Sequence, residues 1–133
     1  MQEKTVFSCV CLFMYEIRNN TLIKYHGNRE VVSIPGGVET IGRCAFEGCT
    51  SIVRVVIGDH VRTINDFAFM GCTSLTSIVI PSSVTTIGEW VFDYCTSFTT
   101  VYYTGSEEDW AKISINSDNE VLLGATVVYN YQG

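Results

Sequence analysis

Basic residues, histidine and proline are scarce in this chain of 133 residues, which has eight lysines and arginines, two histidines and two prolines. The bases are scattered, whereas phosphate backbones and anionic lipid headgroups are bound by clusters of bases, so nucleic acid and membrane surfaces are excluded as partners. The chain also lacks a run of roughly 18 apolar residues, the length that a membrane-spanning helix needs. Charged residues make up 17% and hydrophobic residues 47%, which excludes a disordered tail and indicates one folded domain.

The negative charge is concentrated in the last third of the chain. Residues 1–88 contain seven acidic and seven basic residues, so the formal net charge of -6 comes from residues 89–133, where seven acidic residues are balanced only by Lys112. Such a segment either makes the end of a fold soluble or offers an acidic docking site. Its capping signals, described below, favour the structural role.

The first 25 residues combine an apolar stretch with a hairpin pattern. Residues 5–14 are mostly apolar, but a secretory signal would need a small-x-small cleavage site and a more basic start. Residues 12–25 alternate as strands do on both sides of Asn19-Asn20, a pair that favours a left-handed turn. We predict a hairpin and no clear export signal, which leaves a cytoplasmic location open beside export.

An internal repeat of 23 residues dominates the chain. Segments that begin at Ile34, Ile57 and Ile80 align without gaps, and self-similarity at such a period is the signature of a repeat architecture. Ten columns hold identical or similar apolar and small residues: Ile34/Ile57/Ile80, Val38/Val61/Val84, Ile41/Ile64/Ile87, Ala45/Ala68/Val91, Phe46/Phe69/Phe92, Cys49/Cys72/Cys95, Thr50/Thr73/Thr96, Ser51/Ser74/Ser97, Ile52/Leu75/Phe98 and Val55/Ile78/Val101.

Each repeat predicts one coil of a solenoid. The run Ile52-x-x-Val55-x-Ile57 predicts a short strand with alternate residues inward, and in two repeats a proline follows, which cannot donate to a strand ladder. The Ala-Phe-x-x-Cys stretch predicts a short helix. One unit cannot bury its apolar face alone, so we expect coils stacked ~4.8 Å apart around a continuous core. One further column predicts left-handed backbone, because it holds only glycine and asparagine: Gly42, Asn65 and Gly88.

A stack of coils needs a cap at each end. We expect an amino-terminal cap over residues 1–33, containing the hairpin and a first strand, then three repeats over residues 34–103. A carboxyl-terminal cap follows over residues 104–133. There, Ser106 to Asp109 predicts a capping box with three acids at the positive end of a helix, and residues 127–129 predict a closing strand.

The repeat pattern I-P-x-x-V-x-x-I-G-x-x-A-F-x-x-C-T-S-L-x-x-I closely resembles the BspA-like leucine-rich repeat, or LRR_5 class. Residues 102–119 look like the ending that often follows such arrays, and residues 13–27 resemble their lead-in, so we expect a complete chain. The resemblance implies a right-handed β/α solenoid with short strands and short helices. It also implies a bacterial protein, at the cell surface in many members, that binds proteins or host matrix without catalysis.

Six cysteines are the residues most open to a chemical role. We expect Cys49, Cys72 and Cys95 to be buried thiols, stacked one coil apart and bonded to the turn backbone, although a disulfide or redox site remains an alternative. Cys9 and Cys11 lie two residues apart, and no Cys or His pair with zinc spacing completes a metal site. Cys44 lies outside the repeat columns.

No enzyme signature accompanies the cysteines. His26 and His60 are isolated beside turn residues and are expected to be solvated. Nucleophile-elbow, zinc-protease and phosphate-loop motifs are absent. We therefore expect no catalytic residues, no cofactor and no metal, and keep a thiol or metal enzyme as the remote alternative.

Two surfaces are candidates for contact with partners. Cys44, Phe67 and Trp90 form an apolar stripe that fits either half-buried packing or a homodimer contact. The second surface is the outward side of the predicted strands, where rigid stacked strands offer a flat patch that Val31 and Ser33 extend. Its candidate partner-binding residues are Arg54, Val56, Ser77, Val79, Thr100 and Tyr102.

Arg and Tyr are enriched at interaction hot spots, and the strand patch holds one of each at Arg54 and Tyr102. The sequence thus predicts a non-catalytic module that binds a protein or a glycan on this patch. The alternative within the same fold is an intracellular scaffold that self-associates.

Overall fold

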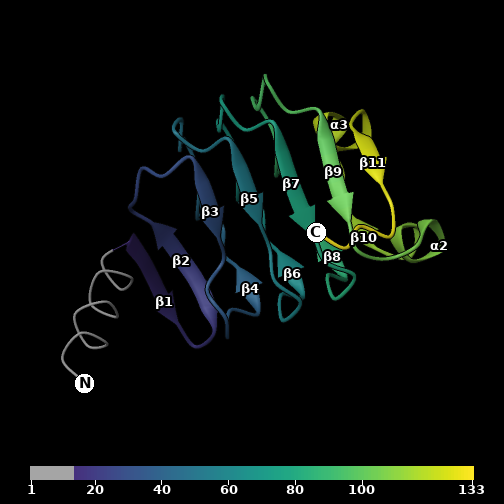
Figure 1. Ribbon diagram of the computed structural model, residues 1–133. Helices are drawn as coiled ribbons and strands as arrows, with labels where there is room; N and C mark the ends of the chain where they lie inside the picture. Colours follow the sequence, from purple (N-terminus) through teal and green to yellow (C-terminus); the bar gives the residue numbers. More distant parts are fainter. Residues whose placement is uncertain (1–13) are drawn as a thin grey trace.

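The computed structural model describes residues 14–133, in which short strands recur with the repeat (Figure 1). Pairs of apolar residues separated by turns favour many brief strands over a few long ones. The elements are β1 (Tyr15–Arg18), β2 (Thr21–Tyr25), β3 (Val31–Ser33), β4 (Thr40–Ile41), β5 (Arg54–Val56), β6 (Thr63–Ile64), β7 (Ser77–Ile80), β8 (Thr86–Ile87), β9 (Thr100–Tyr103), α2 (Glu107–Ala111), β10 (Ser114–Ile115), α3 (Glu120–Leu123) and β11 (Thr126–Val128).

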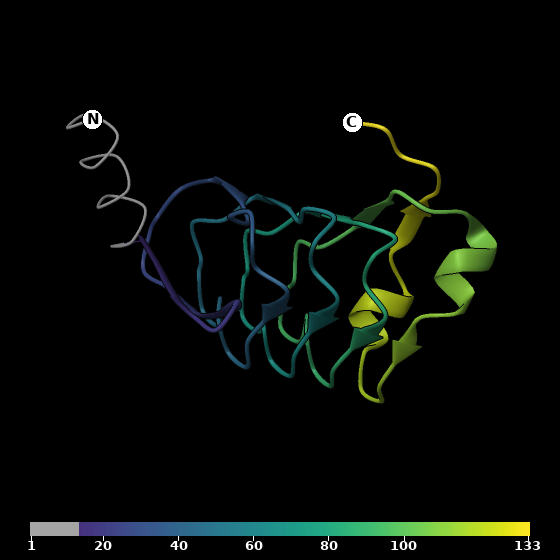
Figure 2. The same ribbon diagram turned by 90° about the horizontal axis from the view of Figure 1, so that it is seen from below.

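The strands form two sheets that wrap one core (Figures 1 and 2). Sheet A runs in the order β1-β2-β4-β6-β8-β10, and sheet B in the order β11-β9-β7-β5-β3. Every pairing is parallel except that of β1 with β2. A coil that returns to its starting point after one repeat places its strands parallel to those of the next coil, so the predicted solenoid is confirmed.

Sheet A was not anticipated from the sequence. Its β4, β6 and β8 are two-residue strands made by the Thr-Ile pairs of the three repeats, where no strand was predicted. The sequence feature that marks these strands is a column of identical threonines. Thr40 pairs with Thr63, and Thr63 pairs with Thr86.

Both end segments continue the stack. At the amino-terminal end β2 pairs in parallel with β4, and β3 pairs with β5. At the other end β10 pairs with β8, and β11 pairs with β9. The solenoid therefore has about five turns, two more than the three 23-residue repeats.

The hairpin and the closing strand match the sequence predictions. Asn19 and Asn20 both adopt positive φ, at 49° and 63°, between the antiparallel β1 and β2. Strand β11 ends one residue before the predicted stretch does, at Val128.

The core is a column of stacked rings. Phe46, Phe69 and Phe92 are at most 1% exposed, and their ring centroids lie 5.0 Å and 5.5 Å apart in nearly parallel planes. Tyr25 extends the column toward the amino terminus and Phe98 toward the carboxyl terminus. Identical residues one coil apart thus build one continuous core, as the sequence predicts.

The predicted short helices of the repeats do not form. The Ala-Phe-x-x-Cys stretches are successive turns, because left-handed residues interrupt each of them. Cys44, Phe67 and Trp90 have φ of 61°, 60° and 59°, and a second left-handed position follows at Gly48, Gly71 and Tyr94. The predicted helices are therefore wrong. A positive φ is rare for residues other than glycine, so the residue types at these positions gave no indication of it.

The Gly42, Asn65 and Gly88 column is not left-handed, contrary to the prediction: none of the three has a positive φ. At the two glycines of this column the backbone approaches its neighbours closely instead. A Cβ on Gly42 would lie 2.7 Å from the Leu22 carbonyl oxygen, and one on Gly88 would lie 2.7 Å from the Asp66 backbone nitrogen.

Three expectations fall on residues outside the described part: the apolar stretch at residues 5–13, Cys9 and Cys11. Within residues 14–133 no helix is long and apolar enough to cross a membrane.

Candidate binding face

The six candidate residues form two adjacent columns on the outward side of sheet B. Arg54, Ser77 and Thr100 are in register on β5, β7 and β9. Two residues further along the same strands, Val56, Val79 and Tyr102 are also in register. The first column extends to Val31 and Thr126, and the second to Ser33 and Val128. The structure therefore brings all six together on one surface, which we call the sheet-B face.

The sheet-B face is less exposed than the sequence suggests. Arg54, Val56, Ser77, Thr100 and Tyr102 are half-buried, and Val79 is only 6% exposed. The prediction that Val79 is exposed to solvent was wrong, because the end of the chain lies over it. The segment of residues 129–133 leaves β11, turns back and passes over the face (Figures 1 and 2).

We call residues 129–133 the return segment. Its backbone is held beyond the end of β9, where the Asn130 amide donates to the Gly105 carbonyl at 2.8 Å and the Tyr131 amide donates to the Tyr103 carbonyl at 2.9 Å. Its path places the Tyr131 side chain beside strand β5, which is 77 residues away along the sequence.

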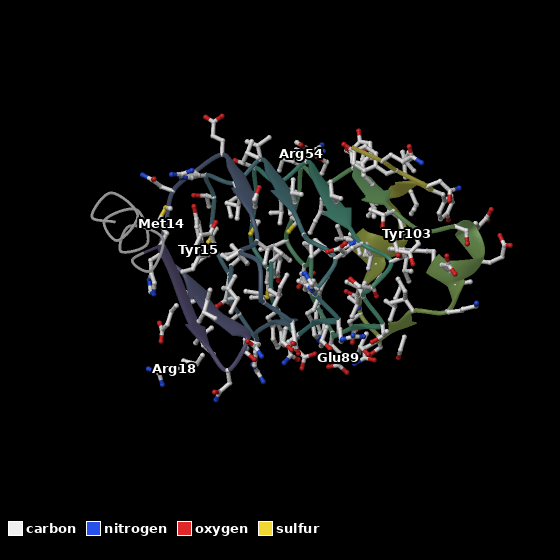
Figure 3. All side chains as sticks on the ribbon, turned by 60° about the horizontal axis from the view of Figure 1, so that its bottom comes forward. Met14, Tyr15, Arg18, Arg54, Glu89 and Tyr103 are labelled. Atoms are coloured by element: carbon white, nitrogen blue, oxygen red, sulfur yellow. The ribbon has the colours of Figure 1, made fainter. Side chains whose placement is uncertain are left out.

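Arg54, Tyr102 and Tyr131 form one cluster. The Arg54 guanidinium donates from Nη2 to the Tyr131 hydroxyl at 3.0 Å and lies 5.2 Å from the Tyr102 ring centroid. The two tyrosine rings are 4.8 Å apart and tilted by 45°. Nη1 also reaches the Ser77 hydroxyl at 3.5 Å. Arg54 lies on one side of the molecule, opposite Arg18 and Glu89 (Figure 3).

A groove of about 430 Å³ runs between the return segment and the sheet-B face. Its floor is formed by Val56 and Val79, Arg54 lies in its wall, and the return segment closes the other side through Tyr131, Gln132 and Gly133. The groove combines an apolar floor with one charged group, the composition that ligand sites share.

Four cysteines of the described part are free thiols: Cys44, Cys49, Cys72 and Cys95. As predicted, two thiols of the repeat column are buried and bond the turn backbone: the Cys72 thiol donates to the Phe46 carbonyl at 3.1 Å and the Cys95 thiol to the Phe69 carbonyl at 3.0 Å. Cys49, which was predicted to be buried as well, is half-buried. The neighbouring Cys95 thiol and burial raise the pKa of the Cys72 thiol. Burial also raises the pKa of Cys49, against the lowering effect of Lys24. A high pKa leaves little thiolate, the reactive form.

The other titratable candidates are at the surface. His26 and His60 are exposed, as expected, each beside one carboxylate, at 3.4 Å from Glu16 and 4.0 Å from Asp59. Within residues 14–133 no three histidine, cysteine or acidic side chains are grouped so that they could hold a metal ion.

The apolar stripe of Cys44, Phe67 and Trp90 is half-buried. The Arg43 guanidinium lies 5.0 Å from the Phe67 ring centroid and shields part of it. All three positions have left-handed backbone. The stripe is therefore partly covered within the chain itself.

The acidic segment begins the end cap, as predicted. The Ser106 amide donates to Asp109 Oδ2 and the Asp109 amide to the Ser106 hydroxyl, at 3.2 Å and 3.1 Å, so the capping box of α2 is complete. These hydrogen bonds, the backbone one above all, lower the pKa of Asp109.

Sequence reasoning missed the role of the return segment. Tyr131 lies outside the repeat and has no partner at a fixed spacing. The only signal was the pair Tyr129 and Tyr131, two aromatic residues after the closing strand.

Comparison with known proteins agrees with this architecture. The model of the BspA type Leucine rich repeat region matches residues 15–117 in six copies. A Treponema pallidum leucine-rich repeat protein of known structure is 28% identical with a TM-score of 0.60, covering 67% of this chain and 49% of that one. A leucine-rich repeat protein from Bacteroides ovatus is 26% identical with a TM-score of 0.58, covering 86% of this chain and 35% of that one.

The chain thus spans less than half the length of either solved protein. None of the curated proteins compared with it matches. The repeat period, the two parallel ladders and the family match over residues 15–117 agree, and the chain belongs to the BspA-type leucine-rich repeat family.

Proposed function

We propose that this protein is a non-catalytic binding module that docks a protein partner on the sheet-B face. Leucine-rich repeat solenoids are binding folds, and their stacked strands offer rigid surfaces to partners. The observation that carries the proposal is the groove over the sheet-B face, with Arg54 and Tyr102 held in one cluster beside an apolar floor. Arg and Tyr are the side chains most enriched at interaction hot spots.

The opposite side of the coil offers less to a partner. On sheet A, Thr40, Thr63 and Thr86 share one column with half-buried side chains. Small hydroxyl side chains give little contact area and are seldom hot spots.

A glycan is a weaker candidate than a protein. It could contact the aromatic rings and hydroxyls of the sheet-B face, but it has no apolar side chain to pack on Val56 and Val79.

The test requires a partner protein isolated on the immobilised chain and then purified. Its affinity is measured for the wild-type chain and for a double variant, Arg54→Glu with Tyr102→Ala. We expect the double variant to bind at least tenfold more weakly, about 1.4 kcal/mol. It should keep its fold, because both side chains lie outside the ring column of the core.

Two controls separate the face from its surroundings. Arg62→Glu makes the same change of charge just before β6 in sheet A and should leave the affinity unchanged. Tyr131→Ala removes the hydroxyl bound to Arg54 and the ring packed on Tyr102 without altering the strands, so it identifies any loss that is due to the Tyr131 side chain alone. Unaltered affinity in the double variant would place the docking site elsewhere, with the Phe67 and Trp90 stripe as the next candidate.

Self-association through that stripe is the competing use of the fold. It predicts a concentration-dependent dimer in sedimentation that Trp90→Ser abolishes and Arg54→Glu preserves. The cover that Arg43 gives to Phe67 favours the sheet-B face over this stripe.

A further inference from the structure

The positive charge of Arg54 is isolated on the sheet-B face. The ten outward positions of the two columns contain no acidic residue and no other basic one: Val31, Arg54, Ser77, Thr100, Thr126, Ser33, Val56, Val79, Tyr102 and Val128. Among residues 14–133, Arg54 forms no ion pair. Neither column therefore supplies an acidic side chain as a counter-charge to Arg54.

The contacts of the guanidinium hold it in place and leave it capacity for a ligand. A guanidinium has five N–H donors in a fixed fork, and the hydroxyls of Tyr131 and Ser77 accept from Nη2 and Nη1, at 3.0 Å and 3.5 Å. Stacking on Tyr102 at 5.2 Å restrains its plane. Because hydrogen bonds to a carboxylate are about twice as strong as those to neutral groups, a carboxylate is the partner that this guanidinium lacks.

The groove beside Arg54 selects what accompanies the carboxylate. Its floor of Val56 and Val79 is aliphatic and half-buried or buried, and its volume of about 430 Å³ admits several side chains. An aliphatic side chain two residues from the acidic one, on the same side of an extended peptide, would displace water from this floor, which is favourable.

The acidic end cap repels such a ligand. The net charge of -6 arises from residues 89–133, and the exposed acids of α2, Glu107, Glu108 and Asp109, lie in the end cap and off the sheet-B face. Like charges on the end cap disfavour docking there, so an acidic ligand is favoured at Arg54 over the end cap.

We propose that the groove between the return segment and strands β5 and β7 binds an extended acidic peptide segment, with its carboxylate on Arg54 and an aliphatic side chain two residues away in the peptide on Val56 and Val79. This rests on the proposed function of the sheet-B face and adds the chemistry of the partner. Tyr131 forms the outer wall of the site, and its hydroxyl orients the guanidinium.

The test uses two synthetic peptides, both acetylated and amidated: Val-Thr-Glu-Thr-Val, which in extended form presents glutamate and both valines on one side, and its analogue with glutamine at the centre. They are titrated into the full ¹⁵N-labelled chain while amide chemical shifts are followed. We expect the glutamate peptide to bind at least tenfold more tightly, with shifts concentrated on β5, β7 and the return segment. A third peptide with glycine in place of both valines should bind severalfold more weakly.

Substitutions of the chain identify the group responsible. Arg54→Gln should reduce the preference for glutamate to less than twofold, Arg54→Lys should keep part of it, and the matched Arg62→Gln on the sheet-A side should keep all of it. Comparing the two peptides on the wild-type chain requires no substitution, so the test stands even if Arg54→Gln fails to fold.

Equal affinities of the glutamate and glutamine peptides for the wild-type chain would overturn the proposal, as would no binding of either at millimolar concentration. Neither result decides the proposed function, which depends on the purified partner protein and the double variant. Shifts confined to the end cap would also overturn the proposal.

Discussion

Replacing the central ring of the core tests the stacked-coil architecture most severely. Phe69 is fully buried between Phe46 and Phe92, with centroid distances of 5.0 Å and 5.5 Å. Phe69→Ala removes the whole ring and both ring contacts. Deletions of this kind cost ~3–5 kcal/mol, and more where the surroundings cannot collapse.

The surroundings of Phe69 are fixed on two sides by strand ladders and along the stack by neighbouring rings, so we expect a cost in the upper half of that range. One kcal/mol lowers Tm by roughly 3–5 °C in a chain of this size, which predicts a loss of roughly 12–25 °C for a cost of about 4–5 kcal/mol.

The assay is thermal and urea unfolding followed by circular dichroism and by tryptophan fluorescence. Leu123→Ala is the matched control, because Leu123 is 67% exposed and its truncation should stay within about 0.5 kcal/mol of wild type. If Phe69→Ala does not fold, Phe69→Leu should show a smaller loss in the same direction. A Tm lowered by only one or two degrees in Phe69→Ala would refute the continuous ring core.

Three further predictions follow from local geometry. Gly88→Ala should destabilise the chain, since its Cβ would lie 2.7 Å from the Asp66 nitrogen, whereas Gly36→Ala, with nothing within 4 Å, should be neutral or slightly stabilising; equal melts for the two would contradict the close-packing argument. The native chain should leave Cys72 and Cys95 unmodified by a thiol reagent at neutral pH, because both are buried. Cys44, Cys49, Cys72 and Cys95 should all be alkylated in denaturant without reductant; a bridge between any two of them, found by mass spectrometry, would overturn the free-thiol assignment. The pKa of Asp109 is lowered in the folded chain, so its contribution to stability should be present above about pH 4, near the unfolded pKa, and lost as the pH falls through the folded pKa. Asp109→Asn should remove this part of the pH dependence of stability. An unchanged pH profile in that variant would count against the capping box.

Much of the fold was predictable because the sequence repeats every 23 residues. Phe46, Phe69 and Phe92 recur at one period, and identical residues one coil apart must stack if the coils stack. The hairpin at Asn19-Asn20 and the capping box at Ser106 are local signals whose chemistry fits one geometry. Each of these depends on residues close in sequence or at a fixed spacing.

The wrong or missing predictions concern features that residue type and spacing do not mark. Phe67 and Trp90 are left-handed although bulky residues rarely are, so neither the loss of the helices nor the place of the left-handed positions was visible in composition. The two-residue strands of sheet A are too short for an alternating pattern to mark them.

The sequence predicted which residues share the sheet-B face, but it did not predict that the return segment lies over them. Strand alternation placed Arg54 and Tyr102 on one face, and the register confirms that position. Tyr131 reaches Arg54 across 77 residues, a contact that no local spacing encodes.

Crosslinking from single positions on the two sheets tests the central claim, that partners dock on the sheet-B face. A photoreactive residue is placed at Ser77, in the middle of the sheet-B face, or at Thr63, in the middle of sheet A, and each chain is irradiated with the purified partner protein. We predict a crosslinked product from position 77 and none from position 63. Crosslinking from position 63 alone, or equal yields from both, would contradict the account.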